Sequence, residues 1–189
     1  IEILSWIRKE LNEGELEIRV DANGAFTPET AMDKLNRLAE FQIHSIEQPI
    51  APKQWSELAT LCERTPINIA LDEELIGIKD QVKKQRCLDA IKPHYIILKP
   101  SLVGGFQSAD EWTALAEERS IGWWITSALE SNVGLNAIAQ YAYSKKVQMP
   151  QGLGTGGLFT NNIDSPLYIH RQFLKMNPDH IWNLKPLNL

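Results

Sequence analysis

The sequence contains little cysteine, few histidines and no long apolar run, and each shortage excludes a class of protein. Its two cysteines, Cys62 and Cys87, lack the spacing of metal ligands. A disulfide framework and a thiolate metal site are therefore excluded, and buried free thiols in a reducing cytosol are predicted. No apolar run approaches the roughly 18 residues that a membrane-spanning helix needs. We therefore predict a globular, cytoplasmic protein with no membrane partner.

The charge of the chain is modest and evenly spread. Nineteen Lys and Arg residues against 24 Asp and Glu residues give a formal net charge of −5, with no block of like charge. Proteins that bind nucleic acid or an anionic membrane carry basic patches, and the sequence shows none. The expected partner is therefore a small molecule and not a nucleic acid.

Short apolar runs alternate with helical patterns along the chain. Because each run is too short for a buried helix, strands are predicted at residues 17–20, 43–46, 67–71, 95–98, 122–126 and 147–149. Helical spacing predicts helices within residues 1–15, 27–41, 52–65, 78–91, 108–120 and 131–146, and a short helix around residues 168–174. Connections of this length join parallel strands, so the fold class is α/β with a parallel sheet.

Charged residues at the predicted strand ends distinguish an open doubly wound sheet from a (β/α) barrel. From Asp21 to Glu47 is 26 positions, from Glu47 to Asp72 is 25, and from Asp72 to Lys99 is 27. Successive strands thus deliver a charged group at the same level. In a barrel the carboxyl ends of the strands meet at one mouth, whereas an open sheet spreads them along a line. A barrel is favoured, although a single Asp after a strand also fits a helix cap.

Asp21, Glu47 and Asp72 are the candidate metal ligands. Carboxylate oxygens suit Mg²⁺, which leaves coordination positions open for substrate oxygens. Zn²⁺ would require imidazole or thiolate ligands, and the four histidines do not share the phase of the carboxylates. The sequence therefore predicts an Mg²⁺ site at the barrel mouth.

Polar neighbours of these carboxylates are candidates for orienting them. Asn23 lies two residues beyond Asp21, and Glu73 is next to Asp72. Glu73 and Glu74 equally fit a solvated helix entry.

Lys99 ends an apolar strand and precedes Pro100, so its ammonium either lies at the surface or faces the barrel mouth. Its phase with the carboxylates favours the mouth. Such a lysine can take part in acid/base chemistry or act as a fixed cation beside developing negative charge. Abstraction of a proton next to a carboxylate, with Mg²⁺ stabilising the resulting enediolate, is the chemistry that these groups fit best.

Four motifs, VDANG, IEQP, ALDEEL and ILKPSLVGG, resemble the metal-ligand and lysine motifs of the enolase superfamily, muconate-lactonising subgroup. Two later segments, ITSALESNVGLNAIAQYA and QGLGTGGLFTNN, are most similar to the o-succinylbenzoate synthase family of menaquinone biosynthesis. The resemblance covers nearly the whole chain. It implies that residues 1–189 are the C-terminal part of a TIM-like barrel, incomplete, with about six strands and without the first two strands and the capping domain.

The resemblance also implies an activity and the residues that carry it. The activity is an Mg²⁺-dependent lyase reaction, the dehydration of a succinyl-hydroxycyclohexadiene carboxylate to o-succinylbenzoate through an enediolate. Lys99 would be the lysine of the sixth barrel strand, which stabilises the enediolate or the substrate ring. Mg²⁺ would be bound by Asp21, Glu47 and Asp72, and the succinyl carboxylate would be held by hydroxyl and backbone N–H groups of Ser127, Gly154, Thr155 and Gly156.

The residues by themselves leave alternatives for these last segments. The glycine-rich stretch of residues 154–157 equally fits a plain flexible loop. Glu130 and Ser131 either line the pocket or cap the following helix, and capping is favoured for Ser131.

The sequence departs from the family in one respect. The Lys-x-Lys motif of the second barrel strand, which supplies the general acid/base in the synthase, is absent. The resemblance places this motif before Ile1, so the chain is expected to be the C-terminal portion of a longer protein. On its own it is expected to bind Mg²⁺ without turning over substrate. The oligomeric state is left open, and a homo-oligomer is compatible with the sequence.

Three other functions compete with this interpretation. An N-acylamino acid racemase or a dipeptide epimerase uses the same scaffold, although dipeptide epimerases place Asp-x-Asp where this chain has GLGTGG. A non-catalytic metal-binding fragment would keep the carboxylates for stability. An ordinary doubly wound binding domain would show an early phosphate loop, which the sequence lacks.

Overall fold

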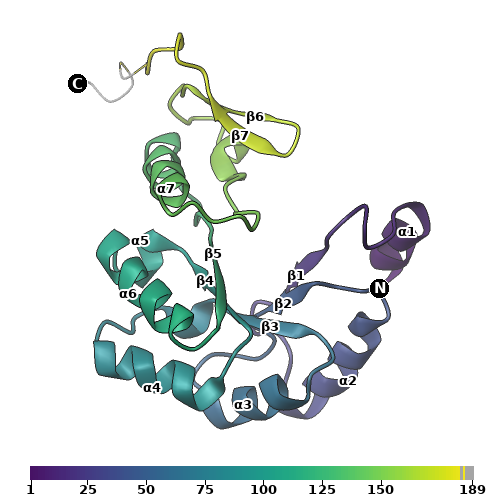
Figure 1. Ribbon diagram of the computed structural model, residues 1–189. Coiled ribbons are helices and arrows are strands. Elements are labelled where there is room, and N and C mark those ends of the chain that lie inside the picture. Colours follow the sequence, from purple (N-terminus) through teal and green to yellow (C-terminus); the bar gives the residue numbers. More distant parts are fainter. Residues whose placement is uncertain (184, 186–189) are drawn as a thin grey trace. The chain divides into compact units, whose positions relative to one another are not determined.

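Five short strands, each followed by a helix, form the main sheet of the computed structural model, which describes residues 1–183 and 185 (Figure 1). The strands are hydrogen-bonded in the order β1-β2-β3-β4-β5. Their bounds are Arg19–Asp21, Ser45–Glu47, Asn68–Leu71, Tyr95–Leu98 and Gly122–Ile125. The pairs β1–β2, β2–β3 and β3–β4 are parallel, which confirms the predicted α/β organisation.

The helices between these strands begin and end close to their predicted limits. Thr27 is the N-cap of α2 and Pro28 its first residue, where the fixed φ of proline suits a helix start. Asp80 caps α4 by accepting a hydrogen bond from the backbone N–H of Lys83 at 2.8 Å. The α-helices are α1 Glu2–Glu10, α2 Pro28–Ala39, α3 Trp55–Arg64, α4 Gln81–Ile91, α5 Pro100–Val103, α6 Phe106–Glu117 and α7 Asn132–Ser144, and the 3₁₀ helices are η1 Glu73–Leu75 and η2 Thr155–Gly157.

The chain divides into two compact units. The first unit comprises Ile1–Ile97 and Asp110–Trp123, and the second comprises Leu98–Ala109 and the chain from Trp124 onward. In the first unit the core is centred on β3, where residues 69–71 are fully buried. Such a continuous apolar run is typical of a parallel strand that is covered on both faces.

The second unit has a smaller core around β5 and α7. Ile125 is fully buried at the end of β5, and Leu135, Ile138 and Ala142 recur along the buried face of α7. Their spacing of three and four residues is that of an amphipathic helix.

The sixth strand predicted at residues 147–149 is wrong. Residues 147–149 form no strand, and the backbone pairs beside β5 through a parallel bridge between Thr126 and Gly152. Pro150 lacks the N–H that a ladder requires, so pairing begins only beyond it. There the Gly152 N–H donates to the Ile125 carbonyl at 2.9 Å, and the Gly152 carbonyl accepts from the Ser127 N–H at 3.0 Å.

The short helix predicted around residues 168–174 is also wrong. This segment forms an antiparallel hairpin of β6, Leu167–His170, and β7, Phe173–Met176, seen as the yellow pair of arrows in Figure 1. Arg171 has a φ of 55° at the turn, so the chain reverses where a helix would have continued. A short run of aromatic and β-branched residues fits either structure by period, and β propensity favours the hairpin.

Both cysteines are free and buried, as predicted. Burial raises the pKa of the Cys62 thiol and that of the Cys87 thiol to about 12. A thiol in this state is neither a nucleophile nor a metal ligand near neutral pH. Among the described residues, no helix is long and apolar enough to cross a membrane.

Candidate active site

The carboxylates of the first unit lie at the carboxyl ends of adjacent strands. Asp21 ends β1 and Glu47 ends β2, and the two are register partners. The pairing continues by one residue, because the Ala22 N–H donates to the Glu47 carbonyl at 3.0 Å. The backbone N–H of Asn23 donates to Asp21 Oδ1 at 2.7 Å, so Asn23 contacts the predicted ligand through its main chain.

Asp72 follows the next strand, β3. Ala70 lies opposite Glu47 in register, so Asp72 comes two residues beyond that level. Its exposed fraction is 3%, in contrast to Asp21, which is exposed. Asp72 is the N-cap residue of η1, and Glu73 is the first residue of that helix and is half-buried.

The three predicted ligands therefore lie at the carboxyl ends of adjacent strands, but their side chains do not form a metal-binding cluster. Within residues 1–183 and 185, no group of three or more His, Cys, Asp or Glu side chains is arranged to hold a metal ion. The donors are all carboxylate oxygens on neighbouring strands that lie about 4.8 Å apart, which is the donor chemistry that Mg²⁺ prefers. The residues fit the ion in the chemistry of their donors and in their positions at neighbouring strand ends.

In the second unit, Lys99 and Ser127 follow neighbouring strand ends. The Thr126 N–H donates to the Leu98 carbonyl at 3.0 Å, and Lys99 and Ser127 are the next residue on each side. Lys99 is half-buried and is the N-cap residue of α5. Ser127 is almost fully buried.

Ser127 meets the glycine-rich segment through its hydroxyl. Its Oγ lies 2.7 Å from the Oγ1 of Thr155, so the two hydroxyls share a hydrogen bond. Gly154 is the N-cap residue of η2, and Gly156 lies within that helix. The structure thus brings the predicted Ser127 and Thr155 together, and the GLGTGG segment forms a short 3₁₀ helix at Thr155–Gly157.

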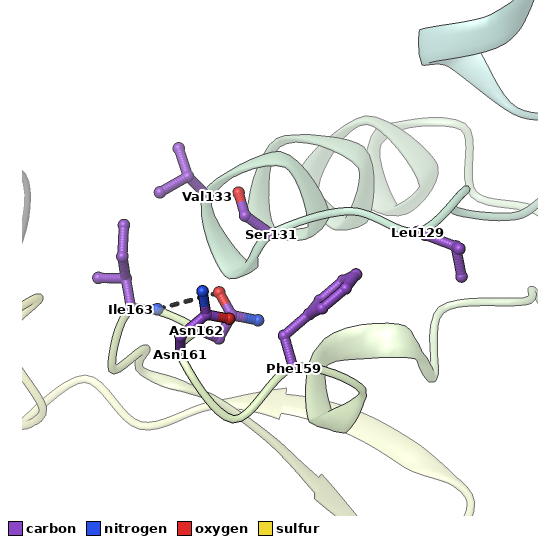
Figure 2. A pocket seen from close by; sticks show the side chains of 7 residues that line it. All are labelled: Leu129, Ser131, Val133, Phe159, Asn161, Asn162 and Ile163. Carbon is purple, nitrogen blue, oxygen red and sulfur yellow. Dashed lines mark hydrogen bonds between the residues drawn. The ribbon is translucent and has the colours of Figure 1, made fainter.

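A cavity of about 590 Å³ lies in the second unit beyond the end of β5. Figure 2 shows its lining residues, Leu129, Ser131, Val133, Phe159, Asn161, Asn162 and Ile163. None of the predicted substrate-binding residues lines it. Its wall carries apolar groups, the Ser131 hydroxyl and the amides of Asn161 and Asn162, and no charged side chain.

The loop before α7 is held by hydrogen bonds at Glu130 and at the start of the helix. Ser131 occupies the N-cap position of α7, but its side chain makes no capping hydrogen bond. The N–H of Asn132 instead donates to the side-chain oxygen of Asn162 at 2.8 Å. The Glu130 carboxylate accepts hydrogen bonds from the Ser101 hydroxyl and from the Ala128 N–H, the latter at 3.2 Å.

Two polar residues beside the carboxylates are buried, which the sequence interpretation did not predict. The solvated helix entry predicted for Glu74 is wrong, because the residue is 4% exposed. Its carboxylate accepts from the Lys53 N–H and from Trp55 Nε1, both at 2.7 Å. Gln48, directly after Glu47, is fully buried. The available signal was its place between a buried strand end and a proline, where a polar side chain must find partners inside the protein.

A sheet of parallel strands that alternate with helices, with acidic residues and a lysine at the carboxyl ends of the strands, is the arrangement of an enolase-type α/β barrel. Residues 1–170 match the family described as enolase C-terminal domain-like, and the chain belongs to this family. The observed strands are accordingly part of an α/β barrel.

Particular relatives are o-succinylbenzoate synthases. The chain is 58% identical to that of Desulfotalea psychrophila over 167 residues, which cover 88% of this chain and 45% of the relative. Identity to the synthase of Thermobifida fusca is 33% over 152 residues, covering 79% and 45%. The chain thus spans about half the length of the curated relatives it matches.

Solved structures also match the chain. The crystal structure of MenC from Desulfotalea psychrophila matches with a TM-score of 0.89 and 57% identity, covering 92% of this chain and 48% of that one. A muconate cycloisomerase variant matches with a TM-score of 0.82 at 23% identity and shares the fold.

Proposed function

We propose that this chain is the part of an o-succinylbenzoate synthase that carries the metal-binding carboxylates, the strand-end lysine and the residues that hold the succinyl chain. The observation that carries the proposal is the 58% identity to the Desulfotalea psychrophila synthase over 167 residues. At the strand ends within this stretch lie oxygen donors and an ammonium, as a dehydration through an enediolate requires.

In the proposed site, Asp21, Glu47 and Asp72 hold Mg²⁺. The ion supplies Lewis-acid stabilisation of negative charge on the substrate carboxylate when its α-proton is lost. The Asn23 N–H, which donates to Asp21 Oδ1 at 2.7 Å, limits the rotation of that carboxylate. The burial of Asp72 keeps it out of bulk water and strengthens its attraction to a cation.

Lys99 acts as the fixed cation of the proposed site. Its position between the buried strand β4 and α5 fixes where its backbone leaves the sheet. An ammonium held there stabilises developing negative charge without itself having to transfer a proton. Because the product is aromatic, the remaining demands are removal of the α-proton and protonation of the leaving hydroxyl, which departs as water. The general acid/base of the Lys-x-Lys motif is the proposed source of both transfers.

Ser127 and Thr155 are the proposed contacts to the substrate's succinyl carboxylate. Their hydroxyls are already 2.7 Å apart, so one can donate its proton to the ligand while it accepts a hydrogen bond from the other. The Gly154 position adds an open approach, since a side chain built there would meet nothing within 4 Å. A carboxylate would thus be held by neutral donors, which fixes its position without a counter-charge.

The test is an ultraviolet assay of o-succinylbenzoate formation by the natural protein that contains this chain, and by the 189-residue chain alone, each with Mg²⁺ and with EDTA. We expect Mg²⁺-dependent turnover by the natural protein and none by the isolated chain. Failure of the natural protein to form product with Mg²⁺ would overturn the synthase proposal, and racemisation of N-acylamino acids by the same sample would replace it. Turnover by the isolated chain would refute the assignment of the acid/base to the missing motif.

A further inference from the structure

Gln48 follows β2, and its backbone is hydrogen-bonded to β3 on one side and to the loop after β1 on the other. It directly follows Glu47, the last residue of β2. Its N–H donates to the Ala70 carbonyl of β3 at 2.9 Å, and its carbonyl accepts from the Gly24 N–H of the loop after β1 at 2.7 Å. Each of these three strands carries a proposed metal ligand at its carboxyl end, because Asp21 ends β1, Glu47 ends β2 and Asp72 directly follows β3.

The conformation of Gln48 is one that a non-glycine residue rarely adopts. Its φ is +34°, in the left-handed region, where the Cβ crowds the backbone. Such a conformation persists only where the surrounding contacts compensate for its strain. The contacts of the Gln48 side chain supply this compensation.

The side-chain amide of Gln48 makes three further hydrogen bonds inside the protein. Its Oε1 accepts from the Asp72 N–H at 3.3 Å and from the Glu74 N–H at 3.2 Å, and its Nε2 donates to the Ile50 carbonyl at 2.9 Å. The orientation of the amide is fixed by these partners, because a flipped amide would direct its NH₂ group at two N–H donors. Since Gln48 is fully buried, water cannot take its place.

We infer that Gln48 is a positioning residue that holds the backbone of Asp72 in register with Glu47, so that carboxylates from separate strands can reach one divalent cation. Glu74 extends the brace, because its N–H is bound by Gln48 while its carboxylate accepts from the Lys53 N–H and from Trp55 Nε1. The inference rests on the proposed metal site and adds the residue that orders it.

The test compares Mn²⁺ binding by the natural protein and two variants, followed by the electron paramagnetic resonance of free Mn²⁺, with Mg²⁺ as competitor. Gln48→Met keeps the length of the side chain and removes its hydrogen bonds. Asn68→Leu is the matched control, because the Asn68 side-chain amide also makes a hydrogen bond to a neighbouring segment. It donates to the carbonyl of His44, which precedes β2, at 3.2 Å, and it lies at the opposite end of β3. We expect the dissociation constant to rise about 10- to 100-fold in Gln48→Met and to stay unchanged in Asn68→Leu.

Backbone hydrogen exchange without metal gives a second readout. Exchange of the Asp72 and Glu74 amides should be faster in Gln48→Met than in Asn68→Leu, because only the first variant removes their acceptor. If Gln48→Met does not fold, Gln48→Asn replaces it, because asparagine keeps the amide but is shorter by one methylene. The same two measurements, the Mn²⁺ dissociation constant and the exchange of the Asp72 and Glu74 amides, then decide.

Each outcome decides between the inference and its alternatives. Wild-type affinity in Gln48→Met, or an equal loss of affinity in both variants, would overturn the role of Gln48 and leave the metal site standing. A natural protein that binds neither Mn²⁺ nor Mg²⁺ would overturn the metal site itself, and the role of Gln48 with it. That failure is visible without any variant.

Discussion

The strand ends of the first unit and those of the second are fastened in different ways. In the first unit, buried side chains brace the loops, as Gln48 and Glu74 do around Asp72. In the second unit, the Ser127 and Thr155 hydroxyls pair beside loops that carry large exposed apolar residues, Leu129 at 73% and Leu158 at 57%. A braced loop suits groups that must keep a fixed geometry for chemistry, whereas an open loop suits recognition of substrate shape.

The largest expected effect comes from removing a proposed metal ligand of the first unit. In the natural protein, Asp72→Asn should lower kcat/KM for o-succinylbenzoate formation by about 10³-fold or more, because a carboxylate-held metal supplies several kcal/mol of charge stabilisation. Asp80→Asn is the control, since Asp80 caps α4 and asparagine caps a helix equally well. A loss of less than about tenfold in Asp72→Asn would remove Asp72 from the metal site.

The next effect tests whether the second unit only holds the substrate. Ser127→Ala should raise KM about tenfold and leave kcat nearly unchanged, because a hydrogen bond to a remote carboxylate is made equally in the ground and transition states. Ser108→Ala removes a comparable hydroxyl, which donates to the Val103 carbonyl at 2.6 Å, and should change neither constant. A fall in kcat with an unchanged KM would assign Ser127 to the chemical step instead.

Two glycine substitutions compare how closely the loops after the strand ends are packed in the first unit and in the second. Gly24 has a φ of +68°, and an added Cβ would lie 3.0 Å from the Ala51 Cα, so Gly24→Ala should cost about 1–3 kcal/mol of unfolding free energy. Gly154 has a negative φ, and an added Cβ would meet nothing within 4 Å. Gly154→Ala should therefore stay within about 0.5 kcal/mol of the wild type.

Urea unfolding of both glycine variants measures these changes. Equal losses at the two positions would contradict the proposed difference between a braced and an open region.

The smallest expected effect concerns the pH dependence of the first unit. Burial lowers the pKa of His94 from its ordinary value of 6.5, and its Nδ1 accepts a hydrogen bond from the Ile69 N–H at 3.1 Å. Folding therefore favours the neutral ring. The stability that it contributes is complete above pH 6.5 and is lost as the pH falls through the lowered pKa of the folded state.

His94→Gln isolates this contribution, because glutamine can accept the same hydrogen bond and does not titrate. Urea unfolding between about pH 7.5 and about pH 5 should show a steeper loss of unfolding free energy in the wild type than in the variant. Equal slopes would show that His94 does not contribute.

The spacing of apolar residues predicted much of the fold. It failed where the same spacing fits both a helix and a strand, or both a strand and a loop. Residues 95–98 form the predicted strand because a short apolar run between two helices has no other way to be buried. Residues 168–174 fit a helix by spacing, yet pairing of Leu167 with Met176 decides for a hairpin. Residues 147–149 have the pattern of a strand, but backbone pairing beside β5 begins only after Pro150, at Gly152. In both segments the pairing of strands decided the outcome, and apolar spacing along the chain does not report which residues pair.

The sequence by itself determined the alternation of strands and helices as far as α7 and the placement of Asp21, Glu47, Asp72 and Lys99 at the strand ends, because both follow from local apolar spacing and chain length. Strand register decided that these residues do not share one level, since Asp72 lies two residues beyond the level of Glu47. Only the tertiary structure decided which polar residues are buried and what they hold. Gln48 and Glu74 brace the strand ends because other elements surround them and leave their polar atoms only protein partners. Burial of a polar side chain depends on neighbours distant in sequence, and the hydrogen bonds that satisfy it are chosen by the folded state.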